Sequence, residues 1–69
     1  MHDMKSRIAS IVKRRRVVLG LTCADVDRRA RLCLGHTASI ERGARSQLAI
    51  DTVKALALAL DLTVDDLIG

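Results

Sequence analysis

The 69-residue sequence has no aromatic residue and no proline, and it contains only four glycines and two cysteines. Without Phe, Tyr or Trp, the core must be assembled from Leu, Ile, Val and Ala. Ala, Leu and Arg are abundant instead, and all three favour helices. The composition therefore predicts a single all-helical domain over residues 1–69, of a size at which one core stabilises a fold only marginally.

Long apolar runs are also lacking. The longest, Ala55–Leu60, is far too short to cross a membrane, and the charged segment MHDMKSRIASIV does not resemble a signal peptide. We therefore expect a cytoplasmic protein without a membrane partner, whose thiols are reduced rather than joined in a disulfide. Dimerisation is then the expected source of additional stability.

Charge is unevenly distributed along the chain. Residues 1–45 hold eleven Lys and Arg against four Asp and Glu, a balance of +7, whereas residues 46–69 hold one Lys against four Asp, a balance of −3. A basic half attracts polyanions, which favours a nucleic-acid partner over the alternative of an ordinary solvated basic surface.

Apolar spacing and capping residues predict five helices, at about residues 5–19, 22–30, 33–42, 50–60 and 63–68. Thr22 and Asp25 have the spacing of a capping box, and Thr63 is expected to cap the last helix. The second and third helices, separated by a short turn, form a helix-turn-helix. The side chains expected to face the core are Ile8, Ile11, Val12, Leu19, Val26, Ala30, Thr37, Ile40, Ile50, Val53, Leu56, Ala57, Leu60, Val64, Leu67 and Ile68. Lys13, Arg14 and Arg15 are expected to be solvated.

A known family has the same pattern of residues. The pattern runs through Arg16-x-x-x-Gly20-Leu21-Thr22, Val26, Ala30, Leu32 and Ile40-Glu41-Arg42-Gly43. It resembles the Cro/C1-type (XRE) helix-turn-helix family of phage repressors and small bacterial regulators, as does the tail Ala57–Leu67. The resemblance implies a lambda repressor-like fold of five helices, with the third helix in the major groove of double-stranded DNA and a homodimeric protein. It also implies a buried ion pair between Arg16 and Glu41.

Four positions depart from the family pattern. Where the family usually has Gln, Ala, Gly, and Ile or Val, this sequence has, in order, Cys23, Asp27, Arg31 and Thr37. Arg31 is not expected to adopt a positive φ easily, because its Cβ opposes that conformation. Asp27 is expected either to pair with Arg31 or to cap a nearby N–H.

The resemblance assigns the DNA contacts residue by residue. The base-facing positions are Cys23, Leu34, Gly35, His36 and Ser39, and the phosphate-contacting positions are Thr22, Arg42, Arg45 and Ser46. None of the base-facing residues is the Arg, Lys, Asn or Gln that usually reads a base edge. Any specificity is therefore expected from apolar contacts and DNA shape, with Leu34 against a thymine methyl group. His36 has the alternative interpretation of a surface histidine.

The remaining features are weaker. Leu58, Leu62 and Ile68 are expected to form an apolar dimer interface rimmed by acidic residues, although single exposed leucines are ordinary. Cys23 and Cys33 are each expected to begin a helix, where a lowered thiol pKa would suit a redox switch, but small apolar fillers are the favoured interpretation.

The sequence is compatible with two classes of function. The first is a small dimeric DNA-binding regulator, and the second is a divergent helix-turn-helix module that binds another protein through Leu34 and the apolar face of its third helix. An enzyme is not expected, because no paired acid, base or nucleophile is in view. Neither a metal site, a cofactor nor a small-molecule ligand is expected, since Cys23 and Cys33 lack the short spacing of a zinc site.

Overall fold

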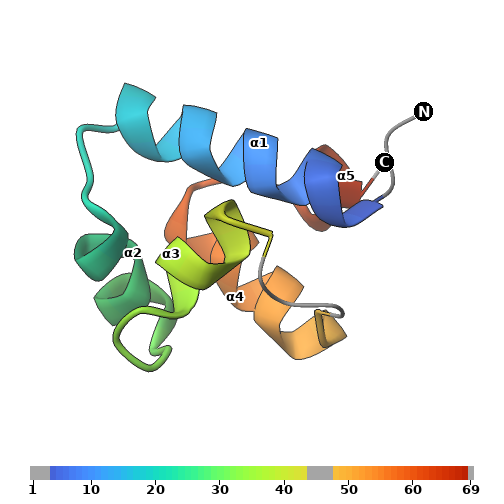
Figure 1. The fold of residues 1–69 in the computed structure, drawn as a ribbon. Helices are drawn as coiled ribbons and strands as arrows, with labels where there is room; N and C mark the ends of the chain where they lie inside the picture. Colours follow the sequence, from blue (N-terminus) through green and yellow to red (C-terminus); the bar gives the residue numbers. More distant parts are fainter. Residues whose placement is uncertain (1–3, 44–47, 69) are drawn as a thin grey trace.

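The structure, a computed structural model, describes residues 4–43 and 48–68, with side chains from Arg7 onward. Its helices are α1 (Met4–Val18), α2 (Cys23–Ala30), α3 (His36–Glu41), α4 (Ile50–Ala59) and α5 (Val64–Ile68), and the described ranges contain no strand. In Figure 1, α1 runs across the top of the view; α3 packs against α1 and α2, and α2 packs against α4. The short α5 packs against α1 and α4. The expected five-helix fold is confirmed. No described helix is both long and apolar enough to span a bilayer.

The core is aliphatic throughout. Its buried members are Ile8 and Val12 from α1, Val26 and Ala30 from α2, Ile40 from α3, Val53, Leu56, Ala57, Ala59 and Leu60 from α4 and its end, and Leu67 from α5. Two expected core residues lie outside it, because Leu19 is 37% exposed and Ile50 is 53% exposed. Leu19 follows the last residue of α1 and Ile50 begins α4, so neither lies within the stripe that its helix turns inward.

Three helices end in the same way. A residue with a left-handed conformation lies one or two positions after each helix, and the residue that follows it donates its N–H to a carbonyl five positions earlier, which is the Schellman motif. The left-handed residues are Gly20, Arg31 and Asp61, with φ of 72°, 58° and 58°. The donors that follow are Leu21, Leu32 and Leu62, at 2.9, 2.8 and 2.7 Å from their acceptors. All three leucines pack against the core, so the apolar residue after the turn fixes where each helix stops.

The turn of the helix-turn-helix differs from the expectation in two respects. Arg31 does adopt a positive φ, because the hydrogen bond of Leu32 to the Asp27 carbonyl and the packing of Leu32 on the core hold it there. The third helix begins at His36 rather than at Cys33, since Gly35 has φ of 89° and interrupts the helical conformation. The turn therefore spans residues 31–35.

We predict that Arg31→Gly stabilises the protein by about 1 kcal/mol, since glycine avoids the Cβ clash of the left-handed conformation. Urea unfolding of the two proteins measures the difference. Arg31→Ala, which removes the charge but keeps the Cβ, is the matched control and is expected to give no such gain. Lys13→Gly, on the exposed side of α1, is expected to lose about 1 kcal/mol. An Arg31→Gly variant no more stable than Arg31→Ala would contradict the prediction.

Candidate nucleic-acid interface

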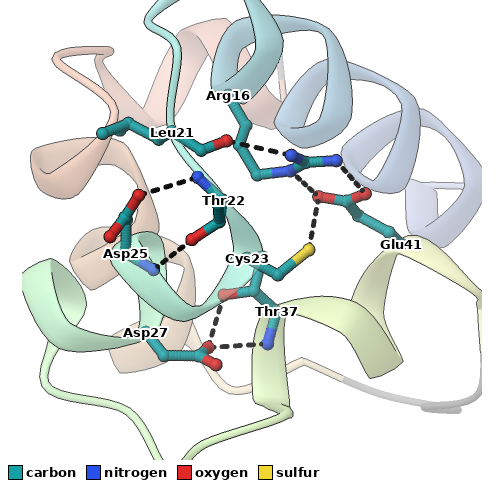
Figure 2. Close-up of polar contacts among 8 residues, drawn as sticks. All are labelled: Arg16, Leu21, Thr22, Cys23, Asp25, Asp27, Thr37 and Glu41. Carbon is teal, nitrogen blue, oxygen red and sulfur yellow. Dashed lines mark hydrogen bonds and ion pairs between the residues drawn. The ribbon is translucent and has the colours of Figure 1, made fainter.

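Asp27 joins the two helices of the helix-turn-helix. It lies within α2, is 1% exposed, and accepts three hydrogen bonds from the segment that begins α3. Its Oδ2 accepts the Gly35 N–H at 2.9 Å, and its Oδ1 accepts the Thr37 N–H at 2.8 Å and the Thr37 hydroxyl at 2.6 Å. Figure 2 shows the carboxylate of Asp27 facing Thr37 across the two helices. The expected capping of a nearby N–H is thus present, and its acceptor comes from another helix.

This capping from α2 replaces a cap that α3 cannot make for itself. The residue before α3 is Gly35, which has no side chain with which to accept the first helical N–H groups. A carboxylate at a helix N-terminus is also favoured by the helix dipole. Burial of this charge is tolerated because it is hydrogen-bonded, and among the described residues no buried side-chain N or O atom lacks a partner. Asp27 and Thr37, two of the four departures from the family pattern, therefore complement each other.

Arg16 and Glu41 form a two-pronged ion pair between α1 and the end of α3. The Arg16 Nε lies 2.7 Å from Glu41 Oε2 and its Nη2 lies 3.1 Å from Oε1, while Nη1 donates to the Leu21 carbonyl at 2.9 Å. The side chains are only 17% and 10% exposed. The hydrogen bonds to Glu41 raise the pKa of Arg16 above its ordinary value. The bidentate geometry makes this a strong, directional contact.

Cys23 belongs to the same cluster. Its half-buried thiol donates to Glu41 Oε2 over 3.6 Å, so in Figure 2 it points toward Glu41. Burial, and next the negative charge of Glu41, raise the pKa of this thiol. The suggestion of a lowered pKa at Cys23 is therefore wrong, because burial and the negative charge of Glu41 outweigh the lowering effect of Arg16 on this pKa. Cys33 does not begin a helix; it is exposed in the turn before α3.

The residues proposed to face bases come from α2, where Cys23 lies, from the turn and from α3. His36 and Ser39 lie on α3 and are half-buried. Leu34 and Gly35 lie in the turn before α3, and Leu34 is 79% exposed. Gly35 has a left-handed conformation there, which glycine adopts without a Cβ clash.

The N-terminus of α2 already holds a carboxylate. The Thr22 N–H donates to Asp25 Oδ2 at 2.9 Å, and the Asp25 N–H donates to the Thr22 hydroxyl at 3.1 Å, so the expected capping box is confirmed. The backbone hydrogen bond from Thr22 lowers the pKa of Asp25, and Arg28 contacts the same carboxylate. The Thr22 N–H, expected to serve a phosphate, is thus engaged within the protein.

Arg42 is the charged phosphate candidate that lies within the described residues. Its side chain is exposed at the end of α3, and its Nη2 lies 3.5 Å from the Ser39 hydroxyl. Arg45 and Ser46 lie outside the described residues. The exposed surface around the helix-turn-helix also contains Arg28 and Arg31.

Two arginines hold the end of α4. Arg15, expected to be solvated, is half-buried and donates through Nε to the Leu60 carbonyl at 3.0 Å. Arg29 donates through Nη1 to the Ala59 carbonyl at 3.4 Å. Both stabilise the negative end of the helix dipole. Neither contact has a local sequence signal, because the partners are 45 and 30 residues apart in the chain.

The apolar residues assigned to a dimer interface lie in different environments. Leu58, on α4, is 85% exposed, whereas Leu62 and Ile68 are partly buried against the core of their own chain. Val17 and Val18, at the end of α1, are a further exposed apolar pair that the spacing of apolar residues did not indicate. Within residues 4–43 and 48–68, His, Cys, Asp and Glu side chains form no cluster of three or more that could hold a metal ion.

The described helices define a five-helix domain that contains a helix-turn-helix of α2 and α3, locked by Asp27. Solved structures of the restriction-modification controller protein C.Esp1396I have a similar fold. The wild-type structure has a TM-score of 0.82 and 22% sequence identity, covering 91% of this chain and 80% of that one. A substituted form of the same protein has a TM-score of 0.81 and 23% identity, covering 91% of this chain and 80% of that one. No family model and no curated protein matches the sequence.

We predict that Arg16→Met and Glu41→Gln each destabilise the fold by about 3 kcal/mol, because each leaves the other charge largely buried without its partner. The double variant is expected to lose much less than the sum of the two losses. Chemical unfolding of all four proteins gives the coupling free energy. Arg28→Met, at the exposed contact with Asp25, is the matched control and is expected to cost less than about 1 kcal/mol. Additive losses at Arg16 and Glu41 would refute the pair.

We predict that iodoacetamide labels Cys33 well before Cys23 at neutral pH, because Cys33 is exposed and the Cys23 thiol is half-buried with a raised pKa. Mass spectrometry of the partly labelled protein distinguishes the two sites. The raised pKa also means that Cys23 contributes stability that is fully present below the unfolded thiol pKa, about 8.5. This contribution is lost as the pH rises through the higher folded value. Equal labelling of the two thiols in the folded protein is the result that would contradict this assignment.

Proposed function

We propose that the protein is a small DNA-binding transcription regulator that places α3 in the major groove of double-stranded DNA. The observation that carries the proposal is the helix-turn-helix, in which α3 lies between the turn at Leu34 and the exposed Arg42. The likeness of the fold to that of a restriction-modification controller protein supports it. A helix of this motif that enters the major groove presents its N-terminal residues to base edges, here His36 and then Ser39.

Affinity and specificity have different sources in this proposal. Phosphate contacts dominate affinity, and Arg28, Arg31 and Arg42 are among the exposed cations near the helix-turn-helix. The sequence of α3, HTASIE, contains no Arg, Lys, Asn or Gln for direct base readout. Base selection therefore depends on Leu34 against a thymine methyl group, on Ser39 and His36, and on DNA shape.

The proposed assembly is a homodimer, with Leu58 at the centre of the interface. Leu58 is the most exposed large apolar side chain among the described residues, and Asp61, Asp65 and Asp66 are exposed on the following turn and α5. These carboxylates disfavour contact with DNA, so the surface that contains them suits a partner protein chain. A dimer bound over a promoter excludes other proteins from it, and repression is therefore the proposed mode of action.

One observation favours a second candidate function, a helix-turn-helix module that binds another protein. Leu34 is 79% exposed in the turn of the motif, and α3 contains no Arg, Lys, Asn or Gln for reading bases. An exposed apolar side chain of this kind suits a protein partner as well as a thymine methyl group. DNA binding at low salt separates the two candidates.

We predict that the protein retards duplex DNA in a gel-shift assay at low salt, and that it enriches a sequence from a random duplex library. Arg42→Ala is expected to weaken binding to all sequences about equally and to reduce the slope of log affinity against log salt by roughly 1. Lys54→Ala on α4 is the matched control, because it removes the same charge from an exposed position among the acidic residues of the second half of the chain.

One result would overturn the proposal, and another would overturn the role of Arg42. Absence of any DNA binding by the folded protein at low salt would overturn it and favour the protein-interaction function. An Arg42→Ala slope equal to that of the Lys54→Ala control would remove Arg42 from the phosphate contacts.

A further inference from the structure

We propose that Asp27 is a positioning residue for base recognition, and that Asp27 and Thr37 act as a matched polar pair that sets the placement of α3. The inference rests on the proposed DNA-binding function. It assigns selectivity to a buried carboxylate on α2 that does not itself reach the outer surface of α3.

The argument begins with the atoms that Asp27 holds. Its carboxylate accepts the N–H groups of Gly35 and Thr37, at 2.9 and 2.8 Å, and these residues flank His36. Rotation of α3 about its axis, or a slide along it, would break at least one of these bonds. The backbone of His36, the first residue of α3, is thus fixed from both sides. Ser39 follows within the next turn of the same helix.

Directionality explains why these hydrogen bonds position α3 while apolar packing alone does not. The helix has only six residues, and it buries two side chains, Thr37 and Ile40. Apolar burial is non-directional and depends on area, whereas a hydrogen bond weakens steeply with distance and angle. The far end of α3 is held in the same way, by the bidentate pair of Glu41 with Arg16. Carboxylates therefore fix both ends of the helix.

Asp27 and Thr37 depend on each other energetically because both are buried. The Thr37 hydroxyl, 2.6 Å from Asp27 Oδ1, is 0% exposed as part of a buried residue, so water cannot replace the carboxylate as its acceptor. Removal of either group alone leaves a polar atom of the other unsatisfied, and such a loss costs more than removal of both. The effects of the two substitutions are therefore coupled.

The first test is a double-mutant cycle on unfolding, with Asp27→Ala, Thr37→Val and the double variant. Asp27→Ala is expected to raise the unfolding equilibrium constant about 30- to 100-fold, and Thr37→Val about tenfold. In the double variant, the rise in the unfolding equilibrium constant is expected to be about fivefold or more smaller than the product of the two single-variant rises. Thr37→Ser keeps the hydroxyl, and it is the matched control that reports loss of the methyl group alone. A rise in the double variant equal to the product of the two single-variant rises would show no coupling and would overturn the matched pair.

The second test is DNA selection by variants that circular dichroism shows to be folded. Thr37→Val, the milder change, is expected to reduce the preference for the wild-type selected sequence over random duplex DNA by about tenfold or more. Its affinity for random duplex and its salt slope are expected to stay at wild-type values, because its exposed cations are unchanged. Thr37→Ser is expected to keep most of the preference.

Asp27→Asn removes one negative charge, so it is compared with Asp65→Asn, the same change at an exposed position on α5. We expect Asp27→Asn to lose the preference and Asp65→Asn to keep it. If the Asp27 variants do not fold, the comparison of Thr37→Val with Thr37→Ser decides the question. A folded Thr37→Val variant with the wild-type preference would overturn the positioning role. A wild-type protein that enriches no sequence would instead overturn the proposed function, while the unfolding cycle would still test the pair.

Discussion

A carboxylate enclosed between two helices is stable only when donors satisfy its oxygens, and Asp27 meets this condition with two backbone N–H groups and one hydroxyl. The rest of the helix-turn-helix depends on that arrangement. It supplies the cap that Gly35 lacks, it holds the start of the third helix, which follows the left-handed Gly35, and it uses the hydroxyl of Thr37. A turn with a left-handed Arg31 is compatible with this geometry because Leu32 remains packed on the core.

The arginines of this protein are divided between the fold and the surface. Arg16 is held by Glu41, while Arg15 and Arg29 hold the last carbonyls of α4. These three guanidinium groups connect helices far apart in the chain, which suits a small core without aromatic residues. A count of charges along the chain therefore overstates the positive surface free to meet a polyanion. The surface near the helix-turn-helix is instead defined by a few exposed arginines, chiefly Arg31 and Arg42.

Local patterns predicted much of what the structure contains. The caps at Thr22 and Thr63 are present, since a capping box needs only residues three apart. The helical spacing of apolar residues predicted most of the core, because that spacing sets which face turns inward. It failed at Leu19 and Ile50, where the helical conformation ends or starts. The pairing of Arg16 with Glu41 came from the family resemblance, not from spacing.

The sequence by itself determined the class of fold, the number of helices and most of their buried faces, because helix propensity, capping and periodicity act within a few residues. Tertiary structure decided the chemistry of the candidate site. Only packing brought Asp27 within hydrogen-bond reach of Thr37 and turned the Cys23 thiol toward Glu41, where burial raised its pKa rather than lowering it. Such contacts depend on distances and solvent exclusion between helices, which no local pattern encodes.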